Sequence, residues 1–222
     1  MEDNHDAIVD NEVRKVGLSW RILVGLVAIA IIGFLAYPFL QEQLNRSASP
    51  SGQSDSDSAE SQFNTGNAYY EAGDWEQAIL AYKRAIELDP SYQAAYANLG
   101  VTYYQQQKFD LAALQYQKAL ELNPNDGEVA YNLGALYLQQ ALSQSESPDP
   151  VLINQAIEQL NKAMEISPNL AEPHFSLGVA HMALGQQEKA IENFETYLTL
   201  DPNKSSQASQ EAQRYLQDLR AQ

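Results

Sequence analysis

The side chains in this sequence best suited to chemistry are three histidines, at positions 5, 174 and 181. His174 and His181 are seven residues apart on one predicted helix, so about 10 Å separates them along its axis. That distance is too long for the two rings to share a metal ion without further ligands. The chain has no cysteine, which excludes disulfides, thiolate zinc sites and cysteine nucleophiles. A phosphate-binding glycine loop, a nucleophile motif and a paired-carboxylate motif are also absent from the sequence, so we expect no enzymatic activity, no metal site and no cofactor.

Side-chain amides recur at a fixed spacing. Asn64, Asn98 and Asn132 are 34 residues apart, and Ser176 follows 44 residues later. An amide both donates and accepts hydrogen bonds, so several of them can bind the backbone of an extended peptide whatever its sequence. The chemistry that this spacing predicts is therefore recognition of a protein or peptide.

The charge of the chain narrows the class of partner. The formal net charge of the 222 residues is −16. Nucleic acids bind to clusters of Lys and Arg, and the sequence has none larger than the pair Lys83 and Arg84. We expect no nucleic-acid partner, and interpret the acidity as a well-solvated surface, with a specific basic partner as the alternative.

An apolar segment near the N-terminus predicts a membrane anchor. Residues 22–40 contain 19 positions without a charge and would span roughly 28 Å as a helix, close to the thickness of the bilayer core. Arg14, Lys15 and Arg21 precede this segment, whereas only Arg46 follows within 20 residues. The bias predicts that the tail, residues 1–21, is cytoplasmic and that everything after residue 40 is on the extracytoplasmic (periplasmic or lumenal) side. A cleaved signal peptide is the alternative, but such peptides have a shorter start and a shorter apolar run.

The segment after the predicted anchor has a linker composition. Residues 41–58 include a serine-rich stretch with few apolar side chains, which cannot bury enough surface to fold. We expect a flexible linker that lets the following domain reorient above the membrane.

From residue 59 onward the sequence repeats itself. Three series of small or ring residues keep one register: Gly66, Gly100, Gly134 and Gly178; Ala78, Ala112, Ala156 and Ala190; Pro90, Pro124, Pro168 and Pro202. Apolar residues at three- and four-residue spacing predict two helices in each repeat, and each proline ends a second helix. Glycine is unfavourable inside a helix, so its recurrence indicates close packing of the paired helices.

This pattern resembles the tetratricopeptide-repeat (TPR) family. The second repeat carries it most completely, through Leu99, Gly100, Tyr103, Ala112, Tyr116, Ala119 and Pro124. The resemblance implies an all-α TPR solenoid of four helix-pair repeats, residues 59–92, 93–126, 127–170 and 171–204. The third repeat holds ten additional residues, which we expect to enlarge the loop near 143–150, with Asp149 capping the next helix and Pro150 at its first position. A tolerated surface insertion and a partner contact are both open for that loop. An amphipathic segment at 205–222 predicts a capping helix.

The resemblance also implies where a partner binds. In TPR arrays the first helix of each pair lines a concave groove, so the recurring amides would form a row along it, although Asn before Leu-Gly is common in the family generally. The residues expected to line the groove are Phe63, Asn64, Asn67, Tyr70, Asn98, Val101, Tyr104, Tyr131, Asn132, Leu138, Phe175 and Met182. Several of them could instead pack into neighbouring helices. Chaperone-binding members clamp a C-terminal carboxylate with Lys and Arg, but Phe63, Glu128 and Asn132 stand where those cations belong, so this mode is rejected.

The sequence therefore predicts a non-enzymatic scaffold or adaptor, anchored in a membrane, that recruits a partner for assembly or biogenesis of a membrane or exported complex. The alternative is a constitutive accessory subunit held in a membrane complex mainly through its transmembrane helix. The oligomeric state, the partner and the pathway do not follow from the residues.

Overall fold

The structure is a computed structural model that describes residues 58–143, 147–201, 203 and 205–221. The predicted tail, the predicted span at 22–40 and nearly all of the predicted linker lie outside these residues. None of the helices within the described ranges has the length and apolar character needed to cross a membrane.

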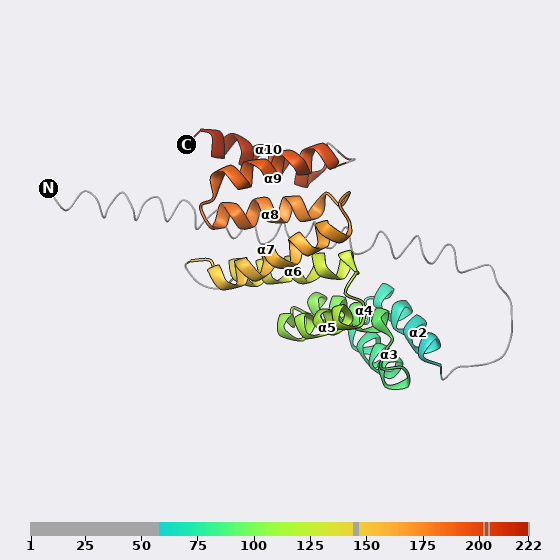
Figure 1. Cartoon of the computed structure of the whole chain (residues 1–222). Coiled ribbons are helices and arrows are strands. Elements are labelled where there is room, and N and C mark those ends of the chain that lie inside the picture. The colour runs from blue at the N-terminus through green and yellow to red at the C-terminus, as the bar shows by residue number, and fades with distance from the viewer. Residues whose placement is uncertain (1–57, 144–146, 202, 204, 222) are drawn as a thin grey trace.

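The described part of the chain is all helical and contains no strand. Its helices are α2 (Ala59–Glu71), α3 (Trp75–Leu88), α4 (Gln93–Gln105), α5 (Phe109–Leu122), α6 (Gly127–Ser143), α7 (Pro150–Ile166), α8 (Glu172–Ala183), α9 (Gln187–Leu200) and α10 (Gln207–Arg220). Each first helix packs most extensively on its own second helix, and each second helix packs on the next first helix. The result is a stack of four helix pairs closed by α10 (Figure 1). The prediction of an all-α TPR solenoid is confirmed.

One side of the stack is formed by the first helices, α2, α4, α6 and α8. Helix α2 contacts α4, and α6 contacts α8, whereas successive second helices make only weak contacts with one another. The first helices therefore lie closer together than the second helices do. A stack with this asymmetry curves towards its first helices, so these helices line the concave side. We call the surface that they present on this side the inner face.

Glycine allows the two helices of each pair to approach. A Cβ atom on Gly178 would lie 2.6 Å from Phe194 Cε1, and one on Gly66 would lie 2.5 Å from Tyr82 Cε1. Phe194 and Tyr82 are 0% and 1% exposed, so neither ring has free space into which it could move. Close packing of the pair is thus the physical reason for the recurring glycine.

The turns within the repeats share one backbone conformation. In repeats 1, 2 and 4 the middle residue of the turn is Gly73, Gln107 or Gly185, with φ of 76°, 58° and 68°. Glycine adopts this left-handed region without steric cost, whereas Gln107 does so at some cost. The third repeat lacks this short turn.

Most of the additional residues of the third repeat are helical, and the connection between α6 and α7, residues 144–149, is also longer than the three-residue turns within the other repeats. Helix α6 continues nine residues beyond its glycine and α7 begins six before its alanine, against five and three in the other pairs. Leu138, Ala141 and Leu142 are buried, so the apolar face of α6 continues and stabilises the extra turn. Asp149 caps α7, accepting hydrogen bonds from the backbone N–H groups of Val151 and Leu152, and Pro150 is in its first turn, as predicted.

Helix α10 covers the end of the stack. Its residues Ala212, Tyr215, Leu216 and Leu219 are buried against α9, which confirms the predicted capping helix. The preceding connection is organised by Asp201, whose carboxylate accepts hydrogen bonds from the Ser206 hydroxyl at 2.9 Å, the Asn203 N–H at 2.8 Å and the Ser209 hydroxyl. The carboxylate is buried, and these bonds compensate its lost hydration.

Candidate functional site

The inner face contains the residues predicted to bind a partner, but at different depths. Five of the twelve reach the surface: Asn64 is exposed, and Tyr70, Asn98, Val101 and Met182 are half-buried. The other seven are buried in the described structure: Phe63, Asn67, Tyr104, Tyr131, Asn132, Leu138 and Phe175. Their contact with a partner stays a prediction.

The buried aromatic residues of this face pack within the repeats. Phe63 lies with its ring centroid 5.8 Å from that of Tyr82 and 5.0 Å from that of Tyr92. Phe175 lies 5.7 Å from Phe194 and 5.2 Å from Tyr197. These rings hold the helix pairs together. In the isolated chain Phe63 and Phe175 therefore pack into neighbouring helices, which was the alternative to contact with a partner.

The four side chains at equivalent positions, three asparagines and Ser176, differ in their exposure to solvent. Asn64 is exposed, Asn98 is half-buried, and Asn132 and Ser176 are 6% and 2% exposed. Asn98 donates a hydrogen bond from Nδ2 to Asn67 Oδ1 at 2.9 Å. Part of the hydrogen-bonding capacity of the row is therefore used within the protein.

Asn67 is the centre of a buried polar network. Its Oδ1 accepts a second hydrogen bond, from the Tyr82 hydroxyl at 2.8 Å. A carbonyl oxygen has two lone pairs, so both are occupied by Tyr82 and Asn98. The Asn67 oxygen is thus committed to joining repeats 1 and 2.

Tyrosine and glutamine form a second set of links between repeats, which sequence reasoning missed. Gln105 donates to the Tyr70 hydroxyl at 3.3 Å, and the Tyr104 hydroxyl donates to Gln139 Oε1. Each pair joins residues 35 apart, from one first helix to the next. Burial raises the pKa of Tyr104 to about 12, which the hydrogen bond to Gln139 partly offsets. The recurrence of Gln105 and Gln139 at a 34-residue spacing was the signal available in the sequence.

Charge is distributed unevenly between the two kinds of helix. The first helices contain four acidic residues, Glu60, Glu71, Glu128 and Glu172, and no Lys or Arg. The basic residues on helices of the four repeats all belong to second helices: Lys83, Arg84, Lys118, Lys162 and Lys189. The first helices of the repeats therefore carry a net negative charge, whereas the basic residues of the repeat helices lie on the second helices.

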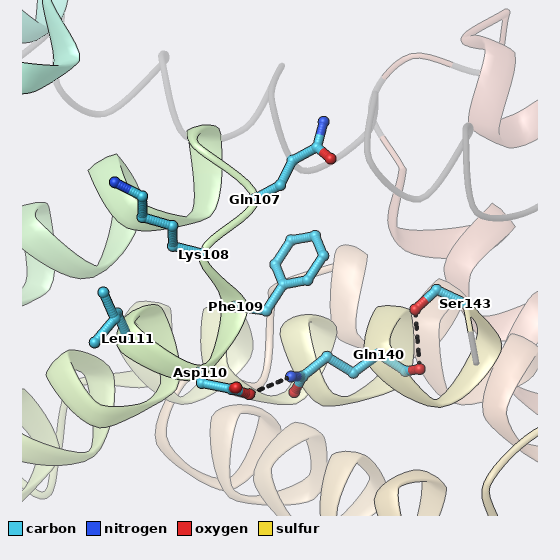
Figure 2. Close-up of a pocket in the computed structure, with 7 residues that line it drawn as sticks. All are labelled: Gln107, Lys108, Phe109, Asp110, Leu111, Gln140 and Ser143. Carbon is cyan, nitrogen blue, oxygen red and sulfur yellow. Dashed lines mark hydrogen bonds between the residues drawn. The ribbon is translucent and has the colours of Figure 1, made fainter.

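A pocket lies at the edge of the stack, beside the extension of α6 (Figure 2). It has a volume of about 420 Å³ and is lined by Gln107, Lys108, Phe109, Asp110, Leu111, Gln140 and Ser143. The ring of Phe109 lies among these residues, and Gln140 donates to Asp110 Oδ1 at 3.1 Å (Figure 2). Gln140 and Ser143 come from the extra turn of α6, so the additional residues of repeat 3 build one wall of this pocket.

The two histidines of α8 are engaged in hydrogen bonds with amides. His174 Nδ1 lies 3.3 Å from Asn193 Oδ1, and His181 Nδ1 lies 2.9 Å from Gln186 Oε1. Burial lowers the pKa of His181. In the described ranges no group of three or more His, Asp or Glu side chains could hold a metal ion.

Family models match most of the repeat region. One described as TPR repeat matches residues 66–107 and 153–185, and three described as tetratricopeptide repeat match 94–126, 115–147 and 171–204. These matches confirm the TPR repeats. No curated protein matches the chain.

Solved structures share the fold. A crystal structure of MamA is 25% identical, with a TM-score of 0.59, over 66% of this chain and 80% of that one. The PilF protein of Pseudomonas aeruginosa is 24% identical, with a TM-score of 0.59, over 72% of this chain and 67% of its own. The first TPR domain of Spaghetti (RPAP3), bound to the HSP90 peptide SRMEEVD, is 23% identical, with a TM-score of 0.52, over 59% and 96%.

Proposed function

We propose that this chain, which is built from tetratricopeptide repeats, is a non-enzymatic scaffold that holds a partner protein or peptide on its inner face. The observation that carries the proposal is the combination of half-buried amide, aromatic and apolar side chains along one side of the stack. Asn64, Asn98 and Met182 offer donors, acceptors and apolar surface to a ligand without large rearrangement of the core. The similar Spaghetti domain, described with a bound peptide, is an example of this fold holding one.

The proposal includes a membrane anchor at residues 22–40, with the repeats on the extracytoplasmic side. It rests on the length of the uncharged segment and on the three-to-one bias of Lys and Arg around it. A scaffold in this position would serve the assembly or biogenesis of a membrane or exported complex. In membrane vesicles of known orientation, protease should remove a C-terminal tag only where the extracytoplasmic face is outward, and removal from vesicles with the cytoplasmic face outward would contradict this orientation.

Affinity capture after cross-linking tests the binding role. We would compare the full-length protein with a triple variant of surface residues, Asn64→Ala, Asn98→Ala and Met182→Ala. The triple variant loses the hydrogen bond from Asn98 to Asn67 but keeps the buried bond from Tyr82 to Asn67. We therefore expect it to fold, as checked by circular dichroism, and to lose the co-purifying partner.

The matched control carries three changes on the second helices: Leu80→Ala, Leu114→Ala and Val151→Ala. These side chains are 59%, 57% and 64% exposed and do not belong to the inner face. We expect this variant to keep the partner. Loss of the partner from the control and not from the inner-face variant would place recognition on the outer side of the stack and refute the proposal.

A further inference from the structure

Two of the four acidic residues of the first helices belong to α6 and α8, which pack against each other. Glu128 and Glu172 occupy equivalent positions, each six residues before the glycine of its own repeat. Because α6 packs against α8, these two carboxylates belong to neighbouring helices and to the same end of each. Both side chains are half-buried rather than fully solvated.

Each of these carboxylates is followed one helical turn later by a polar side chain. Asn132 comes four residues after Glu128, and Ser176 four residues after Glu172, so each pair lies on one side of its helix. We call Glu128, Asn132, Glu172 and Ser176 the acceptor cluster. Lys and Arg are absent from both helices that carry it.

Asn132 has an amide oxygen without a hydrogen-bond partner. The side chain is only 6% exposed, and its Oδ1 is one of two buried side-chain polar atoms of the described residues that lack a partner. Leaving such an atom unpaired is unfavourable, because the hydration it loses on burial is not replaced by another hydrogen bond. The equivalent Asn98 is only half-buried and donates from its Nδ2 to Asn67 Oδ1, so its surroundings differ from those of Asn132.

Glu172 is desolvated without a compensating cation. Burial raises the pKa of Glu172, and the negative charge of Asp201 raises it further, while backbone hydrogen bonds at the start of α8 lower it in part. Ion pairs within the described residues involve Arg84, Lys118, Arg214 and Arg220, and none of them reaches Glu172. A donor with positive charge would satisfy this carboxylate and the neighbouring amide oxygen together.

We propose that the acceptor cluster binds a Lys or Arg side chain of the partner, and that the segment held on the inner face is neutral to basic. This inference rests on the proposed function and names the chemistry of its ligand. A metal ion is a poorer occupant, because the described residues provide no group of three ionisable ligands. The first helices contain four acidic residues and no Lys or Arg, so an acidic segment bound along them would be repelled.

Selection of random peptides on the full-length protein, purified in detergent, tests the inference. We expect the enriched peptides to contain more Lys and Arg than the input library. Replacing the selected Lys or Arg by Gln should weaken binding about tenfold, the effect of losing one hydrogen bond to a charged group. The same peptides should lose their preference for Lys and Arg on the variant Glu128→Gln/Glu172→Gln.

The control variant is Glu158→Gln/Glu192→Gln. It removes the same charge from the same two repeats, at exposed positions of the second helices α7 and α9. It should bind the peptides like the unmodified protein, which separates a local contact from a general effect of net charge. Circular dichroism would check that both variants are folded.

The outcomes distinguish the inference from the function on which it rests. Enriched peptides without excess Lys or Arg, or an excess that persists on Glu128→Gln/Glu172→Gln, would overturn the inference. If those peptides still depend on Asn64, Asn98 and Met182, the proposed function stands. If no enriched peptide depends on these three residues, the proposed function fails and the inference fails with it.

Discussion

The buried network around Asn67 supports a quantitative prediction about the junction of repeats 1 and 2. Asn67 is 3% exposed, and its Oδ1 accepts hydrogen bonds from Tyr82 and Asn98. Asn67→Ala removes both bonds, each contributing about 1 kcal/mol, and leaves the Tyr82 hydroxyl buried without an acceptor, which costs a further 1–3 kcal/mol approximately. We expect the free energy of unfolding to fall by about 3–5 kcal/mol, a large part of the 5–15 kcal/mol typical of a domain.

Tyr82→Phe separates these contributions. The phenylalanine ring keeps the packing but has no hydroxyl, so this change alone should cost about 1 kcal/mol. In the double variant Asn67→Ala/Tyr82→Phe no unpaired hydroxyl remains. Its cost should therefore be smaller than the sum of the single costs by about 2–4 kcal/mol, because the shared bond is lost only once and no hydroxyl is left unpaired.

Urea denaturation followed by far-ultraviolet circular dichroism measures all three costs. Asn64→Ala is the matched control, because Asn64 is an exposed asparagine on the same helix and should change stability by less than about 0.5 kcal/mol. Additive costs for Asn67→Ala and Tyr82→Phe, or a control as destabilised as Asn67→Ala, would refute the account of the network.

Three further predictions concern the repeat core and the C-terminal junction. Gly178→Ala should lower the free energy of unfolding by about 1–3 kcal/mol, because its Cβ would lie 2.6 Å from the immobile Phe194 ring; an unchanged melting temperature would contradict the packing argument. Burial raises the pKa of Asp201, but the hydrogen bonds from Ser209 and its neighbours outweigh burial, so the pKa in the folded protein is lowered. The ionised carboxylate therefore stabilises the fold at pH values above the pKa of the unfolded chain, and this stabilisation is lost as the pH falls through the pKa of the folded protein. Asp201→Asn should accordingly reduce the melting temperature at neutral pH, with the difference shrinking in acid, and a pH-independent difference would argue against it. The ionisation of Glu172 has the opposite effect on stability, because burial raises its pKa and the charged form therefore destabilises the fold. Glu172→Gln should raise the melting temperature at neutral pH and lose this gain when the pH falls below the ordinary pKa of a glutamate. No gain at neutral pH would contradict the desolvation argument.

The repeat architecture could be predicted because its determinants are local and recur. Gly66, Gly100 and Gly178 mark close helix contacts, and each does so through an interaction within one repeat. The cap at Asp149 likewise depends on two residues that follow it directly in the sequence. Patterns of this kind can be read without knowing what lies across the stack.

The depth of the inner-face residues could not be read in the same way. Asn64, Asn98 and Asn132 occupy equivalent positions, yet they range from exposed to buried, because each depends on the side chain that the next repeat presents. The partner of Asn67 is fifteen residues away in Tyr82, and that of Tyr104 is 35 away in Gln139. The helical extension in repeat 3 could not be read for a related reason, because Ala141 and Leu142 form helix only when there is a core to bury them.

The extended helices of repeat 3 have a consequence for how a partner is aligned. In an array of identical repeats each repeat offers the same contacts, so a bound segment could shift by one repeat at little cost in free energy. The extra four residues of α6 lengthen it by about 6 Å beyond the other first helices and break that translational symmetry. One end of the array is thereby physically distinguished from the other, so a segment held on the inner face, as proposed, would have one preferred register and direction.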